Sequence, residues 1–344
     1  MLRRSTILFC TAMSALAIAL SFNIIISPVV TPGGHIHPTG HSIMNQLSSS
    51  NWGGYVVASN QLALDNPGTS SDEALAQPSV TSAYGSWAQQ SVTGSGSTYS
   101  SQWVGIGGYF SGDSSLIQTG TSADTSSGGA SYSAWYELLP NSEVAISSVA
   151  IHPGDMISAS IVCIASCSST TQTWSIMLSD ITDGQSFSTT VSYSSKLLSA
   201  EWIEERPELC HVVVCKLTTL ANFTTAYYGY DYSNIIGTES AAINGVDQAF
   251  ASVPYESVTM DAGSSIYAVP STPSSDSTSF TMVYQNSATS TTTLASSSTS
   301  TTSLSTTSTT SMSSSSTSSA STSSVSTTTI CASGRTNPNG KCLP

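Results

Sequence analysis

The sequence has 344 residues and a formal net charge of −13, yet only 8% of its residues are charged, against about 25% in an ordinary soluble protein. Three cations, Lys196, Arg206 and Lys216, lie between residues 45 and 285, where all 20 acidic residues fall. Nucleic acid is therefore excluded as a partner, because phosphate binding needs a basic stripe. Wholesale disorder is excluded as well, because 39% of the residues are hydrophobic.

The scarcity of charged residues indicates that the protein is adapted to an acidic medium. Below about pH 4 most ordinary carboxylates are protonated, so a chain with few bases carries little charge there and does not repel itself. The alternative is that Ser, Thr and Gly have simply replaced charged residues on the surface of an exported protein.

The N-terminus is typical of an exported protein. Arg3 and Arg4 precede a long apolar stretch, and residues 1–30 are predicted to be a signal peptide or a signal anchor. Cleavage near Ala19 would release a signal peptide, whereas an uncleaved stretch is long enough to span a bilayer. Residues 31–49 form a short N-terminal segment, and its His35, His37 and His41 are expected to lie in an exposed tail without a metal role.

The middle of the chain, residues 50–285, is predicted to be one all-β domain. Short alternating or β-branched runs are separated by turn residues, and no 3.6-residue period is sustained. Asp183-Gly184 suits a type I′ hairpin turn. So many short strands favour an antiparallel sandwich or barrel over a β-α-β array. The expected strands are 54–58, 80–88, 102–106, 131–138, 156–164, 174–178, 186–193, 200–205, 212–219, 225–230, 265–269 and 279–284.

The C-terminal part has a different composition. Residues 286–330 are almost entirely Ser and Thr and are predicted to be a disordered stalk, because they cannot bury enough apolar surface to fold. Residues 331–344 contain Cys331 and Cys342, which a disulfide could close into a loop. We expect a secreted or extracellular protein, either free or attached to the cell surface through its leader or stalk.

The cysteines agree with export. Six of the seven form three pairs close in sequence, namely 163/167, 210/215 and 331/342. An oxidising compartment permits local disulfides. The alternative is a metal site, which would require the first two pairs to meet in space.

Familiar catalytic motifs are missing from the sequence. It has no Gly-x-Ser-x-Gly, His-Glu-x-x-His, Walker or Rossmann motif, and no pair of Asp-Thr-Gly or Asp-Ser-Gly elements. Polar residues framed by apolar ones stand out instead: Gln118, Glu137, and the carboxylates at 201, 204 and 205. Such groups act as catalysts in a site, but they could equally serve only as hydrogen-bonding partners across a sheet.

Five short strings in a fixed order resemble the glutamic peptidases, the eqolisin family G1. The strings are SNWGG at 50–54, QWVGI at 102–106, IQTG at 117–120, AWYE at 134–137 and AEWIEE at 200–205. The resemblance implies a curved antiparallel β-sandwich similar to the concanavalin A fold, secretion, and endopeptidase activity in acid. One departure is Gly107, because members often carry Asp there. A hydrogen bond from that Asp must be missing or replaced.

The resemblance also implies site residues. Gln118 and Glu205 match the catalytic pair, Glu137 matches a carboxylate near it, and Trp52 and Trp103 match aromatic residues that line or support the site. Strand alternation independently puts Glu201, Ile203 and Glu205 on one face and Glu204 on the other. Glu205 would activate a water molecule and later protonate the leaving amine, while Gln118 would stabilise the oxyanion.

Substrate and partner expectations follow from this interpretation. We expect protein or peptide substrates, no cofactor, no metal, and a monomer. Two alternatives stay open from the residues alone. A glycosidase would use Glu137 and Glu205 as its two carboxylates, and a lectin or adhesin would use the Tyr and Trp residues without catalysis.

Overall fold

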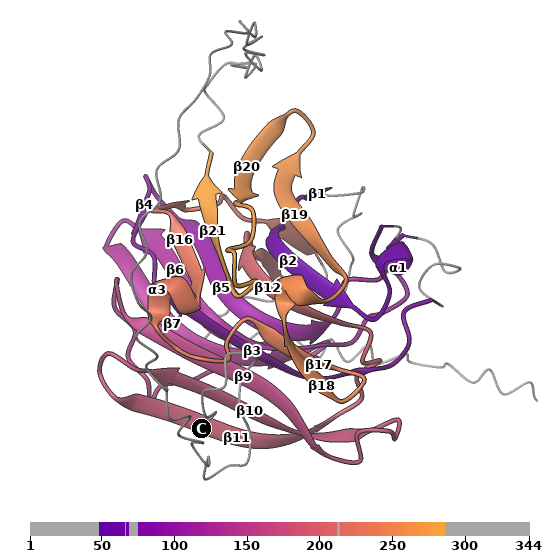
Figure 1. Ribbon diagram of the computed structural model, residues 1–344. Helices are drawn as coiled ribbons and strands as arrows, with labels where there is room; N and C mark the ends of the chain where they lie inside the picture. The colour runs from indigo at the N-terminus through magenta and orange to yellow at the C-terminus, as the bar shows by residue number, and fades with distance from the viewer. Residues whose placement is uncertain (1–47, 66, 69–74, 212–213, 286–344) are drawn as a thin grey trace, which may run out of the picture.

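The structure is a computed structural model that describes residues 48–65, 67–68, 75–211 and 214–285. Two β-layers make up the fold (Figure 1), and every pairing between neighbouring strands within each layer is antiparallel. The predicted all-β antiparallel sandwich is confirmed. The leader, the His-containing segment, the Ser/Thr tract and the C-terminal Cys loop lie outside the described residues.

The first layer, which we call the site sheet, holds the strands that contain the five strings named above. Its order is β19 (Tyr255–Ala262), β2 (Trp52–Ala58), β12 (Ser199–Glu205), β5 (Thr98–Gly107), β6 (Leu116–Ser126), β7 (Gly129–Leu138) and β8 (Val144–Ala145). β12 is therefore central, with a hydrogen-bonded strand on each side.

The second layer, the back sheet, has the order β18 (Val246–Ala249), β17 (Ser240–Ile243), β3 (Val80–Ala88), β9 (Met156–Ala165), β10 (Gln172–Asp180) and β11 (Gln185–Tyr193). β9, β10 and β11 run side by side at the bottom of Figure 1. The strands that join the two layers are β16 (Ala226–Gly229), β21 (Ser279–Tyr284) and β20 (Ser265–Pro270).

The remaining elements are short. They are β1 (Ser48–Ser49), parallel to β19; the pair β4 (Val92–Thr93) and β15 (Asn222–Phe223); the hairpin β13 (Glu208–His211) and β14 (Val214–Leu217); and α1 (Gln61–Asp65), α3 (Tyr230–Ser233) and η1 (Phe250–Ser252). Helix is scarce, as expected. No helix of the described residues is long and apolar enough to cross a membrane.

The cysteine pairing is confirmed in part. Cys163 and Cys167 form a disulfide at the turn between β9 and β10, so their thiolates are not available to a metal. Cys215 is disulfide-bonded too, and the register of β13 and β14 puts it opposite Cys210. The third pair lies outside the described residues.

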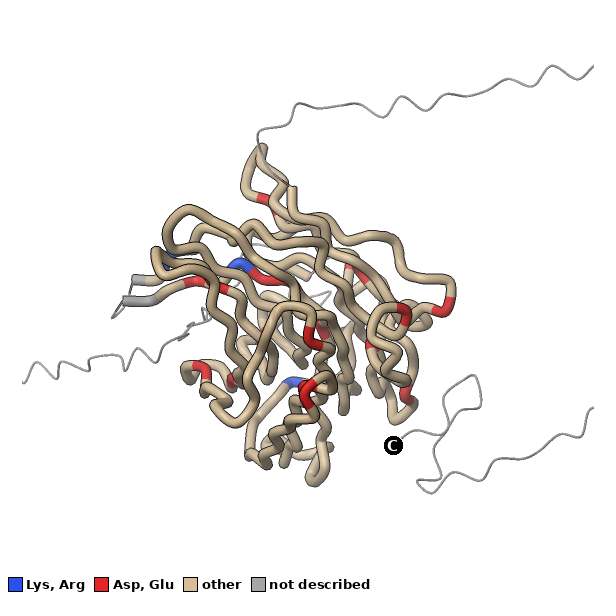
Figure 2. The backbone as a smooth tube through the Cα atoms, turned by 90° about the vertical axis from the view of Figure 1, so that its left-hand side faces the viewer, with Lys and Arg blue, Asp and Glu red and all other residues tan. Residues whose placement is uncertain are grey.

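Charged residues are sparse in Figure 2, where most of the backbone tube is tan, the colour of residues other than Lys, Arg, Asp and Glu. Within the described ranges the Lys and Arg residues are Lys196, Arg206 and Lys216. Several acidic groups are buried instead of exposed, among them Glu201, Glu204 and Glu239, each with no exposed surface.

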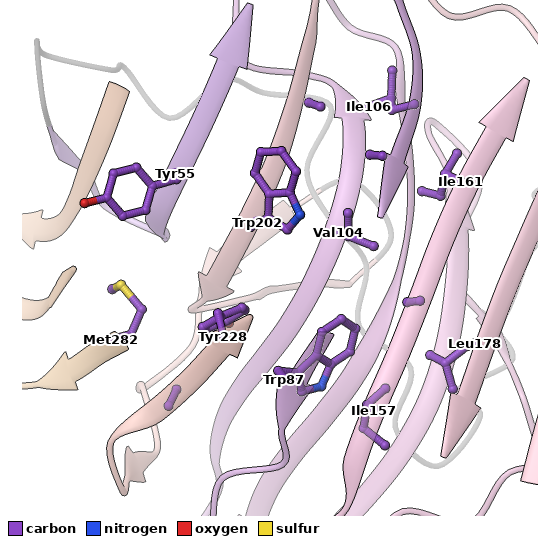
Figure 3. Close-up of a cluster of buried hydrophobic side chains, with 14 of the residues drawn as sticks. Tyr55, Trp87, Val104, Ile106, Ile157, Ile161, Leu178, Trp202, Tyr228 and Met282 are labelled. Atoms are coloured by element: carbon purple, nitrogen blue, oxygen red, sulfur yellow. The ribbon is translucent and has the colours of Figure 1, made fainter. Parts of the chain in front are cut away.

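The main hydrophobic core lies between the two sheets. Tyr55, Val104 and Trp202 of the site sheet pack with Trp87 and Ile161 of the back sheet (Figure 3). Two indoles also tie the layers by hydrogen bonds: Nε1 of Trp87 donates to Oγ1 of Thr121 at 2.9 Å, and Nε1 of Trp202 donates to the Tyr84 carbonyl at 2.8 Å. The layers are therefore held by both apolar burial and buried polar pairs.

A second apolar cluster covers the other face of the site sheet. Trp52, Trp103, Trp135 and Ile203 belong to it, as do α1 through Ala63 and Leu64 and the β5–β6 connection through Tyr109 and Phe110. The site sheet is thus buried on both faces. Polar side chains on the face toward this second cluster must find partners there.

Candidate active site

The five predicted site residues lie on one face of the site sheet. Directly opposed residues of antiparallel strands share a face, and so do alternate residues along a strand. Glu205 is opposite Trp52 of β2, and Gln118 is opposite Glu137 of β7. Trp103 of β5 is opposite Ile203, two residues before Glu205. The alternation predicted for β12 is therefore confirmed, and the face is the one covered by the second cluster.

Glu205 is held by two nitrogen donors. Its side chain has no exposed surface. Nε1 of Trp103 donates to Oε2 at 2.7 Å, and Nδ2 of Asn51 donates to Oε1 at 3.4 Å. Asn51 is itself fixed, because the Ser49 hydroxyl donates to its Oδ1 at 2.8 Å. Each carboxylate oxygen therefore has a donor, which fixes the orientation of the group.

Asn51 is a site residue that the sequence did not predict. The residue lies inside the SNWGG string, directly before the predicted Trp52. The sequence pattern that could have indicated Asn51 is a short polar residue directly before the apolar run that forms β2. Only the fold shows that a residue 154 positions away in sequence is its partner.

Gln118 is oriented by Glu137. Both side chains are fully buried, and Nε2 of Gln118 donates to Oε2 of Glu137 at 2.7 Å. Oε1 of Gln118 accepts no hydrogen bond from the described residues. The amide therefore has one N–H bound to a carboxylate, with the second N–H and the carbonyl oxygen available to a reacting group.

The indole of Trp103 connects the two polar residues. Its Nε1 contacts Glu205, while its ring lies over Gly105, where a Cβ atom would be 2.8 Å from Cζ3 of the indole and 3.3 Å from Cβ of Gln118. Trp52 packs against Trp103 edge-to-face, with ring centroids 5.0 Å apart. Glycine at 105 is thus required for the indole to extend from Glu205 toward Gln118.

Glu204 lies on the opposite face, among side chains between the sheets. Nε2 of Gln90 donates to both of its oxygens, at 3.1 and 3.2 Å. Burial raises the pKa of Glu204 well above its ordinary value, although hydrogen bonds from Ser100, Tyr228 and Gln90 oppose that shift. The group is therefore a protonated structural carboxyl in acid.

Potential metal ligands gather elsewhere in the described part of the chain. Ligand atoms of His152, Asp155 and Asp183 lie within 4.8 Å of one another. His152 and Asp155 precede β9, and Asp183 is in the β10–β11 turn. None of the three is on a strand that carries the predicted site.

Comparison with known proteins identifies the family. The profile of the Peptidase A4 family matches residues 50–249, more than half of the chain. The chain belongs to this family. It is a glutamic-type peptidase that hydrolyses peptide bonds as an endopeptidase, and the resemblance to the eqolisins is confirmed. No curated protein is similar enough to count as a match.

Several solved structures are similar to this chain. A scytalido-glutamic peptidase bound to a transition state analog inhibitor is 22% identical, with a TM-score of 0.52 over 69% of this chain and 98% of that chain. SCP-B, an eqolisin in complex with the tripeptide Ala-Ile-His, is 22% identical with a TM-score of 0.49 over the same shares. Aspergilloglutamic peptidase from Aspergillus niger is 24% identical, with a TM-score of 0.43 over 55% of this chain and 99% of that chain. The similarity to the first of these, at 22% identity, shows the fold alone.

Proposed function

We propose that this peptidase is secreted and cleaves protein substrates in acid through Glu205 and Gln118, with water as the nucleophile. The observation that carries the proposal is the Trp103 indole, which contacts Glu205 at one end and lies beside Gln118 at the other. Two polar side chains that are 87 positions apart in sequence thus share one buried face. Peptide hydrolysis needs a base and an oxyanion donor in such an arrangement.

Each residue has one task in the reaction. The ionised carboxylate of Glu205 takes a proton from water as the water oxygen bonds to the peptide carbon. The second N–H of Gln118 donates to the resulting oxyanion, because its first N–H is held by Glu137. Protonated Glu205 then gives its proton to the amine as the carbon–nitrogen bond breaks, which returns the carboxylate.

Two features of the chain support secretion into an acidic medium. The Cys163–Cys167 disulfide fits an oxidising compartment. Burial raises the pKa values of Glu201, Glu204 and Glu239 well above the ordinary range, so the fold is compatible with protonated carboxyl groups inside it.

The test is an assay of the purified full chain on a denatured protein substrate between pH 2 and 7, with Glu205→Gln beside the parent. We expect most activity at the acidic end. The variant should be slower by at least about 10²–10⁴-fold, because both proton transfers are lost. Circular dichroism must show that the variant is folded. A folded Glu205→Gln protein with parental activity would overturn the proposal.

A further inference from the structure

The end of β5 cannot carry a side chain. Gly107 has a φ of 96°, and a Cβ atom there would lie 2.3 Å from the carbonyl oxygen of Ser115. The same atom would lie 3.2 Å from Oδ2 of Asp113. A carboxyl group from the β5–β6 connection therefore lies beside the position at which related peptidases often carry Asp.

Asp113 fixes the start of the strand that carries Gln118. It has no exposed surface, and its Oδ1 accepts hydrogen bonds from the backbone N–H of Ser115 at 2.9 Å and from the Ser115 hydroxyl at 2.5 Å. Ser115 immediately precedes β6, which begins at Leu116. The Lys196 backbone N–H donates to the same hydroxyl at 3.0 Å. The position of Gln118 thus depends on a turn that Asp113 closes.

Glu201 is a second buried carboxyl group beside this turn. It is opposite Gly105 on β5, which in turn is opposite Gln118 on β6. It faces the Ser199 side chain and the backbone N–H of Gly107. Burial raises the pKa of Glu201 well above its ordinary value, and the charge of Asp113 raises it further; burial also raises the pKa of Asp113. The mechanism proposed above uses neither group.

We propose that Asp113 is a positioning residue for Gln118: its carboxyl group closes the turn before β6, and repulsion between Asp113 and the neighbouring Glu201, once both are ionised, loosens that turn as pH rises. The inference rests on the proposed role of Gln118. Asp113 would then supply a carboxyl group beside Gly107, where related peptidases often carry Asp.

The other titratable groups around the pair do not cancel its charge. Lys196 is the cation that lowers the pKa of Asp113, but its side chain is exposed and its ammonium also donates to the Gly112 carbonyl. Tyr193 faces Asp113, and Tyr109 faces Glu201, Glu256 and Asp65. Burial raises the pKa values of both tyrosines above their ordinary range, so they stay neutral. Two ionised carboxylates here would share a single exposed cation, and repulsion in a buried site is costly.

Asp113→Asn and Asp113→Ala test the proposal in the full chain, with Asp231→Asn at an exposed position as the matched control. Urea midpoints at pH 3 and pH 7 and the pH profile of kcat/KM are measured for all four proteins.

Asn retains an acceptor for Ser115 but cannot ionise. Asp113→Asn should therefore stay within about threefold of the parental kcat at pH 3, lose less stability than the parent between pH 3 and 7, and keep activity to higher pH. Asp113→Ala should lose about 10- to 10²-fold in kcat with little change in KM, because misplacement of a catalytic group has costs of this order.

Two results would overturn the inference: parental pH profiles of both stability and activity in Asp113→Asn, or parental kcat in a folded Asp113→Ala. If Asp113→Ala does not fold, the Asp113→Asn profiles decide alone. The stability measurement needs no catalysis. If Gln118 proved dispensable, the proposed function would fail, while the urea midpoints would still show whether Asp113 and Glu201 form a pH-sensitive pair.

Discussion

Two adjacent, fully buried glutamates on β12 lie in different environments. Glu205 faces the second apolar cluster and accepts from the Trp103 indole, whereas Glu204 faces the back sheet and accepts from Gln90. Alternation along a strand is sufficient to separate them. A single step along the strand therefore places the two carboxyl groups on opposite faces of the site sheet, and the proposed mechanism uses only the face of Glu205.

Glu204→Gln should remain within a few-fold of the parental activity at pH 3. Because burial keeps Glu204 protonated in acid, a neutral amide of the same shape is a close substitute, and its oxygen can still accept from Gln90. The measurement is kcat/KM on a denatured protein, with circular dichroism to verify folding. An inactive, folded Glu204→Gln enzyme beside an active Glu205→Gln enzyme would show that the two roles have been assigned in reverse.

Gln118→Ala should lower kcat by about 10²–10³-fold, the usual cost of one oxyanion donor. KM should change little, because the lost hydrogen bond forms mainly in the transition state. Single-substrate kinetics at pH 3 separate the two parameters. Parental kcat in the folded variant would remove Gln118 from the mechanism and leave its bond to Glu137 as a structural one.

The partners of these residues were beyond what the sequence could show. Strand alternation placed Glu205 correctly because it is a local property of seven residues. Gln90, which binds Glu204, and Asn51, which binds Glu205, are 114 and 154 positions away from their partners. No local pattern encodes such pairs, since they exist only once the strands are in register.

At the scale of elements, the strand that carries Gln118 was the hardest to predict. β6 runs from Leu116 to Ser126, and its second half is rich in Gly, Ser, Thr and Asp, which are common in turns. Pairing with both β5 and β7 outweighs that preference. The strand expected at 212–219 is confirmed only in its middle, because β14 covers Val214–Leu217, and its hairpin partner β13 at Glu208–His211 was not predicted.

Gly105→Ala should disturb β5 as a support for the site. The added Cβ would lie 2.8 Å from Cζ3 of Trp103 and 3.1 Å from Cδ1 of Leu116. The indole must shift to avoid that overlap, and with it the donor to Glu205. We expect a loss of stability of about 1–3 kcal/mol, as for other overpacked sites, and a lower kcat.

Gly128→Ala is the matched control for this substitution, because the nearest atom to a Cβ there is the Ser126 hydroxyl oxygen at 3.6 Å. Urea unfolding and kcat at pH 3 are measured for both variants. Equal stability and activity of the two would mean that the indole tolerates a methyl group and that Gly105 does not position it.

At the scale of the whole molecule, burial favours the protonated form of five acidic groups among the described residues. Burial raises the pKa values of Glu201, Glu204 and Glu239 well above their ordinary range, and it also raises those of Asp113 and the half-buried Glu256. Glu239 belongs to the other layer: it directly precedes β17 of the back sheet, and its side chain accepts a hydrogen bond from the backbone N–H of Ser86 at 2.7 Å. Burial therefore favours protonated carboxyl groups on the back sheet as well as on the site sheet.

The direction of the pH dependence follows from linkage. A carboxyl group whose pKa is higher in the folded state than in the unfolded state binds more protons when folded, so it stabilises the fold fully below its unfolded pKa of about 4. That contribution is lost as pH rises through the folded pKa. Asp276 has a lowered pKa and acts in the opposite direction, losing its contribution as pH falls, but it is a single and largely exposed group.

Urea midpoints should therefore be highest near pH 3 and fall steadily toward pH 7.

Glu239→Gln, which removes one buried ionisable group on the back sheet, should reduce that fall without lowering activity at pH 3. Asp231→Asn at an exposed position should leave the slope unchanged. Because the free energy of unfolding changes by about 1.4 kcal/mol for each pH unit and each proton released, even one such group is measurable. A midpoint that rises from pH 3 to 7 would mean that these carboxyl groups are ionised in the folded protein and that their burial does not favour acid.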